Sequence, residues 1–189
     1  MLTVEFMGMP NAGKTSGIKA TDNVLKHERN KKIARVTESG NRSPLDKDKR
    51  FKFNAWAFND TVNRIMEYQL RDNLDYLLVD KGIYDYAAFT DALFREGILT
   101  AEQKEAQESY LRQFKSLEDK VIVLLVEPEV AMGREEKYGS AGGRVINEDF
   151  LETLYESYAE TISEIDLPKL VLEGPKPIED EKEKILDFL

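Results

Sequence analysis

Residues 8–15 read Gly-Met-Pro-Asn-Ala-Gly-Lys-Thr, a complete G-x-x-x-x-G-K-[ST] motif. The run before it, residues 2–7, is short, apolar and partly β-branched, so it predicts a buried strand. Residues 14–25 contain no proline and favour a helix, despite Gly17. Strand, glycine-rich loop and helix form the context that this motif needs, so its position argues against a chance match.

The residue types of this loop indicate how it would bind a nucleotide. Glycines let the backbone turn so that successive N–H groups point at phosphate oxygens, and the helix N-terminus adds partial positive charge. Lys14 is expected to reach the β- and γ-phosphates, and the Thr15 hydroxyl is expected to ligate Mg²⁺. The predicted cofactors are therefore ATP and Mg²⁺. The loop residues predicted to bind them are Gly8, Asn11, Ala12, Gly13, Lys14, Thr15 and Ser16.

Composition limits the classes of protein to which the chain can belong. A chain of 189 residues suits a single domain over residues 1–189, and a net charge of −9 argues against nucleic-acid or membrane binding. The absence of cysteine excludes disulfides and thiolate zinc sites. No segment approaches the ~20 apolar residues of a membrane span, and no signal peptide pattern opens the chain, so we expect a cytoplasmic protein.

Strand and helix patterns alternate along the chain. After the first strand, the strand candidates are residues 32–37, 76–80, 121–126 and 170–172. Helices are predicted over residues 53–68, 84–94, 100–117 and 147–165, and from residue 177 onward. This alternation predicts an α/β fold with a parallel sheet and right-handed crossovers. Residues 39–52 and 133–144 interrupt the pattern and are expected to be loops or flaps.

Charged side chains follow each predicted strand, at the edge where parallel sheets bind ligands. Asp80 closes an apolar strand, in the position from which a carboxylate holds Mg²⁺ opposite the loop threonine, although it could also cap the next turn. Lys81 could reach a substrate oxygen or only the surface. Glu38 could accept the proton of an attacking hydroxyl, bind an acceptor sugar or lie in a solvated loop. Arg42 could bind an acceptor phosphate through two parallel hydrogen bonds.

These residues give the predicted site. Lys14, Glu38, Asp80 and Arg144 are the predicted catalytic residues, Thr15 and Asp80 the metal ligands, and Glu38, Arg42 and Lys81 the acceptor-binding residues. Three aromatic side chains, of Phe53, Trp56 and Phe58, could stack on an acceptor base, but aromatic residues at helical spacing are more often part of a core.

Arg134 and Arg144 flank three glycines and a tyrosine. Glycine hinges beside arginines favour a lid, over about residues 133–146, that closes over ATP, excludes water and brings positive charge to the transferred phosphoryl group. Arg134 is assigned to the nucleotide, and Arg144 to catalysis because it follows a glycine pair. The alternative is a charged surface loop.

With these residues together, the chain resembles the thymidylate kinase and deoxynucleoside kinase group of P-loop kinases. The resemblance rests on the phosphate loop and on residues 37–40, 80–85 with 88–89, 127–131 and 147–158. It implies a three-layer sandwich around a five-stranded parallel sheet of order 2-3-1-4-5, Mg-ATP as donor, and an acceptor site between the second and third strands. The group usually has Asp/Glu-Arg where this chain has Asp80-Lys81, and Glu-Pro where it has Glu38-Ser39, so the identity of the acceptor does not transfer.

The predicted function is ATP-dependent transfer of the γ-phosphoryl group to a small molecule, a nucleoside or a nucleoside monophosphate. The alternative is a P-loop ATPase that acts as a nucleotide-dependent switch or binding module. A guanine-reading Asn-Lys-x-Asp segment, which would favour a switch, does not follow the fourth strand. The helix over residues 101–114 could form a homodimer interface, but a packing helix of a monomer would look the same.

Overall fold

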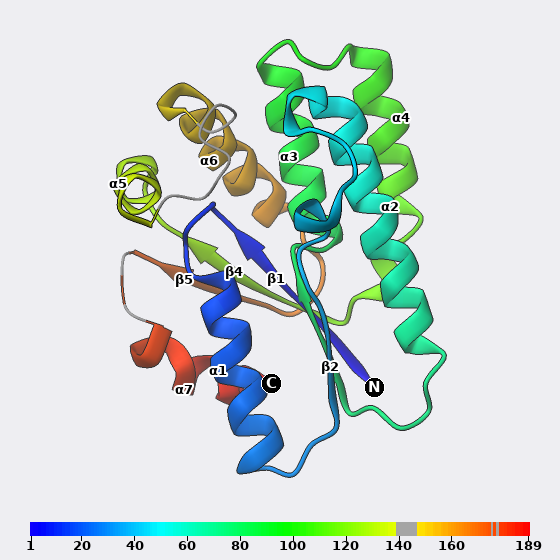
Figure 1. Cartoon of the computed structure of the whole chain (residues 1–189), viewed down its shortest axis with the longest axis vertical. Coiled ribbons are helices and arrows are strands. Elements are labelled where there is room, and N and C mark those ends of the chain that lie inside the picture. Colours follow the sequence, from blue (N-terminus) through cyan, green and yellow to red (C-terminus); the bar gives the residue numbers. More distant parts are fainter. Residues whose placement is uncertain (139–146, 175, 177) are drawn as a thin grey trace.

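The fold is built around one parallel sheet, seen in a computed structural model that describes residues 1–138, 147–174, 176 and 178–189. Its strands are β1 (Leu2–Gly8), β2 (Ile33–Val36), β3 (Tyr76–Asp80), β4 (Lys120–Leu125) and β5 (Lys169–Glu173). They lie in the order β2-β3-β1-β4-β5, and every neighbouring pair is parallel (Figure 1). The strand order implied by the resemblance is therefore confirmed.

Helices cover both faces of the sheet. They are α1 (Lys14–His27), α2 (Arg50–Gln69), α3 (Ile83–Arg95), α4 (Ala101–Arg112), α5 (Pro128–Tyr138), α6 (Glu148–Ser163) and α7 (Ile178–Phe188), with short 3₁₀ turns at Ser39–Arg42, Lys47–Lys49 and Lys115–Leu117. Within the described residues, no helix is both long and apolar enough to cross a bilayer.

The alternation of side chains along each strand explains the layers. Val4 and Phe6 of β1 pack with Ile18 of α1 and Ile185 of α7 on one face of the sheet. Met7 packs on the other face, in a core shared by α3, α5 and α6. A fully buried side chain of this kind contributes about 1.5–3 kcal/mol, so both faces of the central strand stabilise the fold. The buried polar residues of β1 are Thr3 and the carboxylate Glu5.

Side-chain caps begin two of the helices. The Thr100 hydroxyl accepts a hydrogen bond from the Gln103 N–H at 3.2 Å, and Gln103 Oε1 accepts one from the Thr100 N–H at 3.0 Å. Asn147 Oδ1 accepts a hydrogen bond from the Phe150 N–H at 2.8 Å and starts α6. Such caps satisfy N–H groups that have no partner within the helix.

Several boundaries differ from the sequence prediction. The segment predicted as a loop over residues 39–52 ends in α2, which begins at Arg50. The helix predicted over residues 100–117 ends at Arg112, and the chain reaches β4 through a short 3₁₀ turn. Residues 133–138, predicted as the start of a loop, are the last turns of α5, because the Glu-Glu-Lys run within them favours helix more than the flanking glycines oppose it. The rest of the predicted lid, residues 139–146 with Arg144, lies outside the described residues.

Candidate functional site

The phosphate loop lies between the end of β1 and the start of α1, and its backbone needs glycine at both ends. A Cβ on Gly8, whose φ is +135°, would lie 1.9 Å from the Leu124 carbonyl oxygen. Gly13 has a φ of +101° and Asn11 a φ of +58°, both in the left-handed region. Such turns direct consecutive N–H groups into one concavity, where anions bind. The predicted strand, loop and helix thus form as expected.

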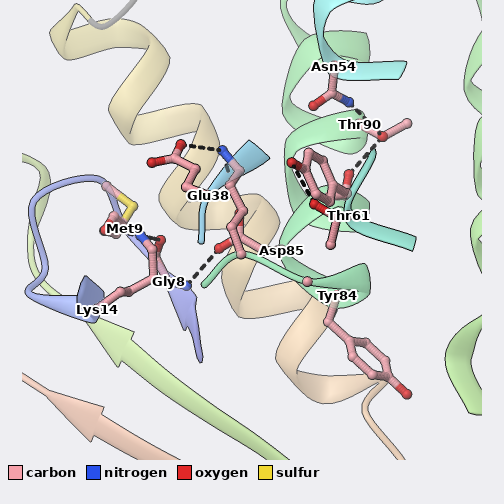
Figure 2. Close-up of polar contacts among 12 residues, drawn as sticks. Gly8, Met9, Lys14, Glu38, Asn54, Thr61, Tyr84, Asp85 and Thr90 are labelled. Atoms are coloured by element: carbon pink, nitrogen blue, oxygen red, sulfur yellow. Dashed lines mark hydrogen bonds and ion pairs between the residues drawn. The ribbon is translucent and has the colours of Figure 1, made fainter. Parts of the chain in front are cut away.

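Lys14 and Arg134 both contact this loop. Lys14 Nζ donates hydrogen bonds to the Gly8 oxygen at 2.7 Å and to the Met9 oxygen at 2.9 Å, so its ammonium group lies over the loop (Figure 2). Arg134, on α5, donates from one guanidinium nitrogen to the Asn11 oxygen at 2.8 Å. The structure therefore brings Lys14 and Arg134 together at the phosphate loop.

Thr15 and Asp80, the predicted metal ligands, are direct neighbours. Thr15 Oγ1 donates a hydrogen bond to Asp80 Oδ2 at 2.7 Å, although the two residues are 65 positions apart in the chain. Burial raises the pKa of Asp80, although the Lys14 charge and the Thr15 hydrogen bond act in the opposite direction. A hydroxyl and a carboxylate are oxygen ligands of the kind that Mg²⁺ takes, together with water and phosphate oxygens. Among the described residues, no group of three or more metal-ligating side chains occurs.

Glu38, Lys81 and Asp85 form a charged cluster beside the loop. Lys81 Nζ lies 3.9 Å from Glu38 Oε1 and 3.7 Å from Asp85 Oδ1. Burial opposes ionisation of Glu38, but the charges of Lys81, Lys14 and Lys47 outweigh it and hold the pKa of this carboxyl below its usual value. Glu38 is therefore ionised at neutral pH.

Lys81 reaches this cluster from an uncommon backbone conformation. Its φ is +69°, in the left-handed region that lysine rarely adopts, at a cost of about 1–2 kcal/mol. Its ammonium group also lies 3.4 Å from the centre of the Phe89 ring, within cation–π range. Such backbone strain is typical of residues that the surrounding fold holds in a functional position.

A buried carboxylate pair holds the backbone that follows Lys81. Glu5 accepts hydrogen bonds from the N–H groups of Gly82, Tyr84 and Asp85 at 2.9, 3.0 and 2.8 Å, and Glu118 accepts one from Ile83 at 3.1 Å. These are the N–H groups that the first turn of a helix leaves unpaired.

Burial disfavours ionisation of both carboxyl groups of this pair. Burial raises the pKa of Glu5, and burial together with the charge of Glu5 raises the pKa of Glu118 well above its usual value. The raised pKa of Glu118 favours its protonated form beside Glu5. A Cβ on Gly82 would lie 2.2 Å from Glu118 Oε1, so the backbone passes against the pair and only glycine fits there.

One cavity of about 600 Å³ joins the phosphate loop to a chamber between α2, α3 and α6. Glu38 and Lys81 lie in its wall, between the two ends. The chamber is largely apolar, and Asn54, only 5% exposed, brings an amide into it. Its aromatic lining residues are Phe53, Tyr86, Phe89 and Phe150, and the cations that line the whole cavity are Lys14, Lys47, Arg50, Lys81 and Arg134.

Some predicted residues lie elsewhere. Arg42 is half exposed, forms an ion pair with Asp60 at 3.6 Å and is outside the cavity lining. Phe58 packs edge-on against Tyr86 and Tyr110, and Trp56 packs in the same core cluster, so of the three candidate stacking residues only Phe53 lines the cavity.

Other residues were missed, although one left a signal. Glu5 is a charged residue within an otherwise apolar strand, and that alone indicates a buried polar role. Asp85 is one of several charged residues that follow β3, and no local pattern indicates its contact with the phosphate loop. Nor does any local pattern connect Asn54 with the chamber.

Comparison with known proteins shows likeness in structure. No protein-family model matches the chain, and no curated protein matches it in sequence. Three solved structures of a deoxyadenosine kinase from M. mycoides, with bound dATP, with bound dCTP, and with dCMP and dCDP, superpose with TM-scores of 0.75–0.77. Identity is 17–18%, over 97–98% of this chain and 97% of those chains.

At this identity, the likeness establishes the fold. The resemblance noted in the sequence is therefore confirmed at the level of architecture: the chain has the fold of the deoxynucleoside kinase-like P-loop kinases.

Proposed function

We propose that the protein is an ATP-dependent kinase that transfers the γ-phosphoryl group of Mg-ATP to the hydroxyl of a nucleoside. The observation that carries this proposal is the single cavity, which has a phosphate loop at one end, an aromatic chamber at the other and an ionised carboxylate between them. A switch protein needs only the nucleotide end of such a cavity. A chamber beyond the loop favours a second substrate.

The nucleotide end would hold the triphosphate. The loop N–H groups and the Lys14 ammonium would bind the β- and γ-phosphates. Thr15 and Asp80 would hold Mg²⁺, which when bound neutralises phosphate charge and orients the triphosphate. Arg134 would add positive charge from the α5 side.

The chamber end would hold the acceptor. Phe53, Phe89 and Phe150 offer apolar walls for a planar base, and the Asn54 amide offers a donor and an acceptor for its polar edge. Glu38 would accept the proton of the acceptor hydroxyl. The hydroxyl oxygen forms the new bond to the γ-phosphorus, the bond from that phosphorus to the β–γ bridging oxygen breaks, and ADP leaves.

A nucleoside monophosphate is the second candidate acceptor. Lys47 and Arg50 line the cavity and would suit an acceptor phosphate, as would Lys81. The structural neighbours support the nucleoside reading, because they are described as deoxyadenosine kinases with bound dATP, dCTP or dCMP.

A panel of nucleosides and nucleoside monophosphates with γ-labelled ATP and Mg²⁺ tests the proposal. Transfer of label to a nucleoside, lost in Lys14→Ala and in Glu38→Gln, supports it, whereas transfer only to monophosphates selects the second candidate. Slow hydrolysis of ATP without transfer to any member of the panel overturns both and favours the switch.

A binding measurement separates the nucleotide end from the acceptor end. Mg-ATP at 100 times its Kd should stabilise the native protein by about 2.7 kcal/mol, and Lys14→Ala should abolish the resulting rise in melting temperature. Lys19→Ala, an exposed lysine on the same helix, is the matched control and should keep it.

A further inference from the structure

Asp85 connects the phosphate loop to the acceptor side of the cavity. Its side chain is completely buried at the start of α3. Asp85 Oδ2 accepts a hydrogen bond from the N–H of Gly8, the first residue of the loop, at 3.1 Å (Figure 2). Its other oxygen, Oδ1, lies 3.7 Å from Lys81 Nζ. The Asp85 carboxylate thus contacts both Gly8, at the start of the phosphate loop, and Lys81, on the acceptor side of the cavity.

Lys81 lies between Asp85 and Glu38. Its side chain is only 14% exposed, so its ammonium group has little access to water. The nearest oxygens of Asp85 and Glu38 are 3.7 and 3.9 Å away, longer than a normal hydrogen bond. The ammonium group is therefore held between two carboxylates and the Phe89 ring, with donor capacity left for an oxygen atom in the cavity.

The start of α3 keeps Asp85 fixed. Glu5 accepts the hydrogen bond of the Asp85 N–H itself at 2.8 Å, and the Tyr158 hydroxyl of α6 faces the Asp85 carboxylate. Burial raises the pKa of Asp85, while the charges of Lys81 and Lys14 lower it, so the two lysines favour its ionised form. A rigid, buried carboxylate of this kind can set the distance between its two partners.

We propose that Asp85 is a positioning residue that fixes the position of Lys81 relative to the phosphate loop, so that the acceptor and the triphosphate are correctly placed relative to each other. The kinetic test of this proposal rests on the proposed function, whereas the binding test needs only a nucleotide. The proposal predicts that the charge of Asp85 affects acceptor kinetics through Lys81, and that the Asp85 oxygen bonded to the Gly8 N–H affects nucleotide binding at the loop.

Two substitutions at Asp85 separate these roles. Asp85→Asn keeps an oxygen for the Gly8 N–H but loses the charge that faces Lys81. The Kd for a non-hydrolysable ATP analogue, measured by calorimetry, should stay near that of the wild type, while kcat/KM for the acceptor falls by about tenfold or more, as expected on loss of a charged partner. Asp85→Ala removes both contacts, so it should weaken analogue binding as well.

A double-variant cycle with Lys81→Met tests whether the two residues act as a unit. If they do, the Asp85→Asn/Lys81→Met protein should be no slower with the acceptor than the slower single variant. Asp91→Asn is the matched control: Asp91 lies on the same helix and binds Lys104 and Ser157 outside the cavity lining, so it should lower stability without changing acceptor kinetics.

Several results would overturn the proposal. Multiplicative losses in the double variant, or Asp85→Asn with acceptor kinetics like those of the wild type, would contradict the link to Lys81. Asp85→Ala with unchanged analogue binding would contradict the link to the loop. If no acceptor is phosphorylated at all, the proposed function fails independently of this proposal. The proposal is then tested by analogue binding and by NMR. The resonance of the Lys81 ε-methylene should shift in Asp85→Asn, and an unchanged resonance would refute the proposal.

Discussion

Replacing Glu5 by leucine removes the acceptor of three buried N–H groups at the start of α3, those of Gly82, Tyr84 and Asp85. Each buried N–H left without a partner costs about 1–3 kcal/mol, so the substitution should cost roughly 3–9 kcal/mol. Typical domains unfold with about 5–15 kcal/mol in total. We therefore expect Glu5→Leu to lose most of the free energy of unfolding, although leucine suits the apolar surroundings of the strand.

Urea denaturation followed by circular dichroism measures this loss as a change in the extrapolated free energy of unfolding. Glu118→Gln is the matched control, because glutamine keeps an oxygen for the Ile83 N–H and is neutral, like the protonated carboxyl that the raised pKa of Glu118 favours. It should lose no more than about 1 kcal/mol relative to the wild type, the size of one ordinary hydrogen bond. A Glu5→Leu protein as stable as the wild type, or a Glu118→Gln protein that is equally damaged, would refute the reasoning.

Three further predictions follow from the geometry. Gly8→Ala should prevent stable folding or abolish nucleotide binding, because its Cβ would lie 1.9 Å from the Leu124 oxygen, and thermal melting with and without Mg-ATP checks this. The pKa of Glu118 is raised in the folded state. The stabilisation that this carboxyl adds to the free energy of unfolding is therefore fully present below its usual pKa of 4.5 and is lost as pH rises through the pKa of the folded state. Glutamine does not ionise, so the stability of Glu118→Gln relative to the wild type should increase with pH above 4.5. Urea titrations at a series of pH values test this, and a free energy of unfolding that varies with pH in the same way in both proteins would contradict it. Phe89→Ala should raise the KM for the acceptor and leave the Kd for an ATP analogue unchanged. A change in the Kd for the analogue without a change in the KM for the acceptor would contradict the assignment of the chamber to the acceptor.

Most of the fold could be predicted from local patterns. Apolar runs of strand length, a glycine-rich loop after the first of them and the Thr100 and Asn147 caps each carry a signal within a few residues. The helix end at Arg112 and the helix over residues 133–138 were missed, because helix boundaries depend on packing as well as propensity.

The site could be predicted only where its chemistry is local. The loop, Asp80, Glu38 and Lys81 each follow a strand, so the topology of a parallel sheet brings them together. Asp85 carries no such signal for its contact with Gly8, because 77 residues separate the two and the contact needs the exact placement of α3 against β1. The ion pair of Arg42 with Asp60 likewise depends on how the chain enters α2, which no motif specifies.

The positive wall of the cavity stands in contrast to a chain with a net charge of −9. Field lines from a concave cluster of lysines and arginines converge at its opening, while the acidic exterior repels approaching polyanions. A mobile triphosphate is small enough to pass that exterior and enter, whereas a polymer with many phosphates would meet the repulsion along its whole length. The shape of the charge distribution would therefore sort anions by size before any hydrogen bond forms, and added salt should weaken this sorting by screening both parts of the field.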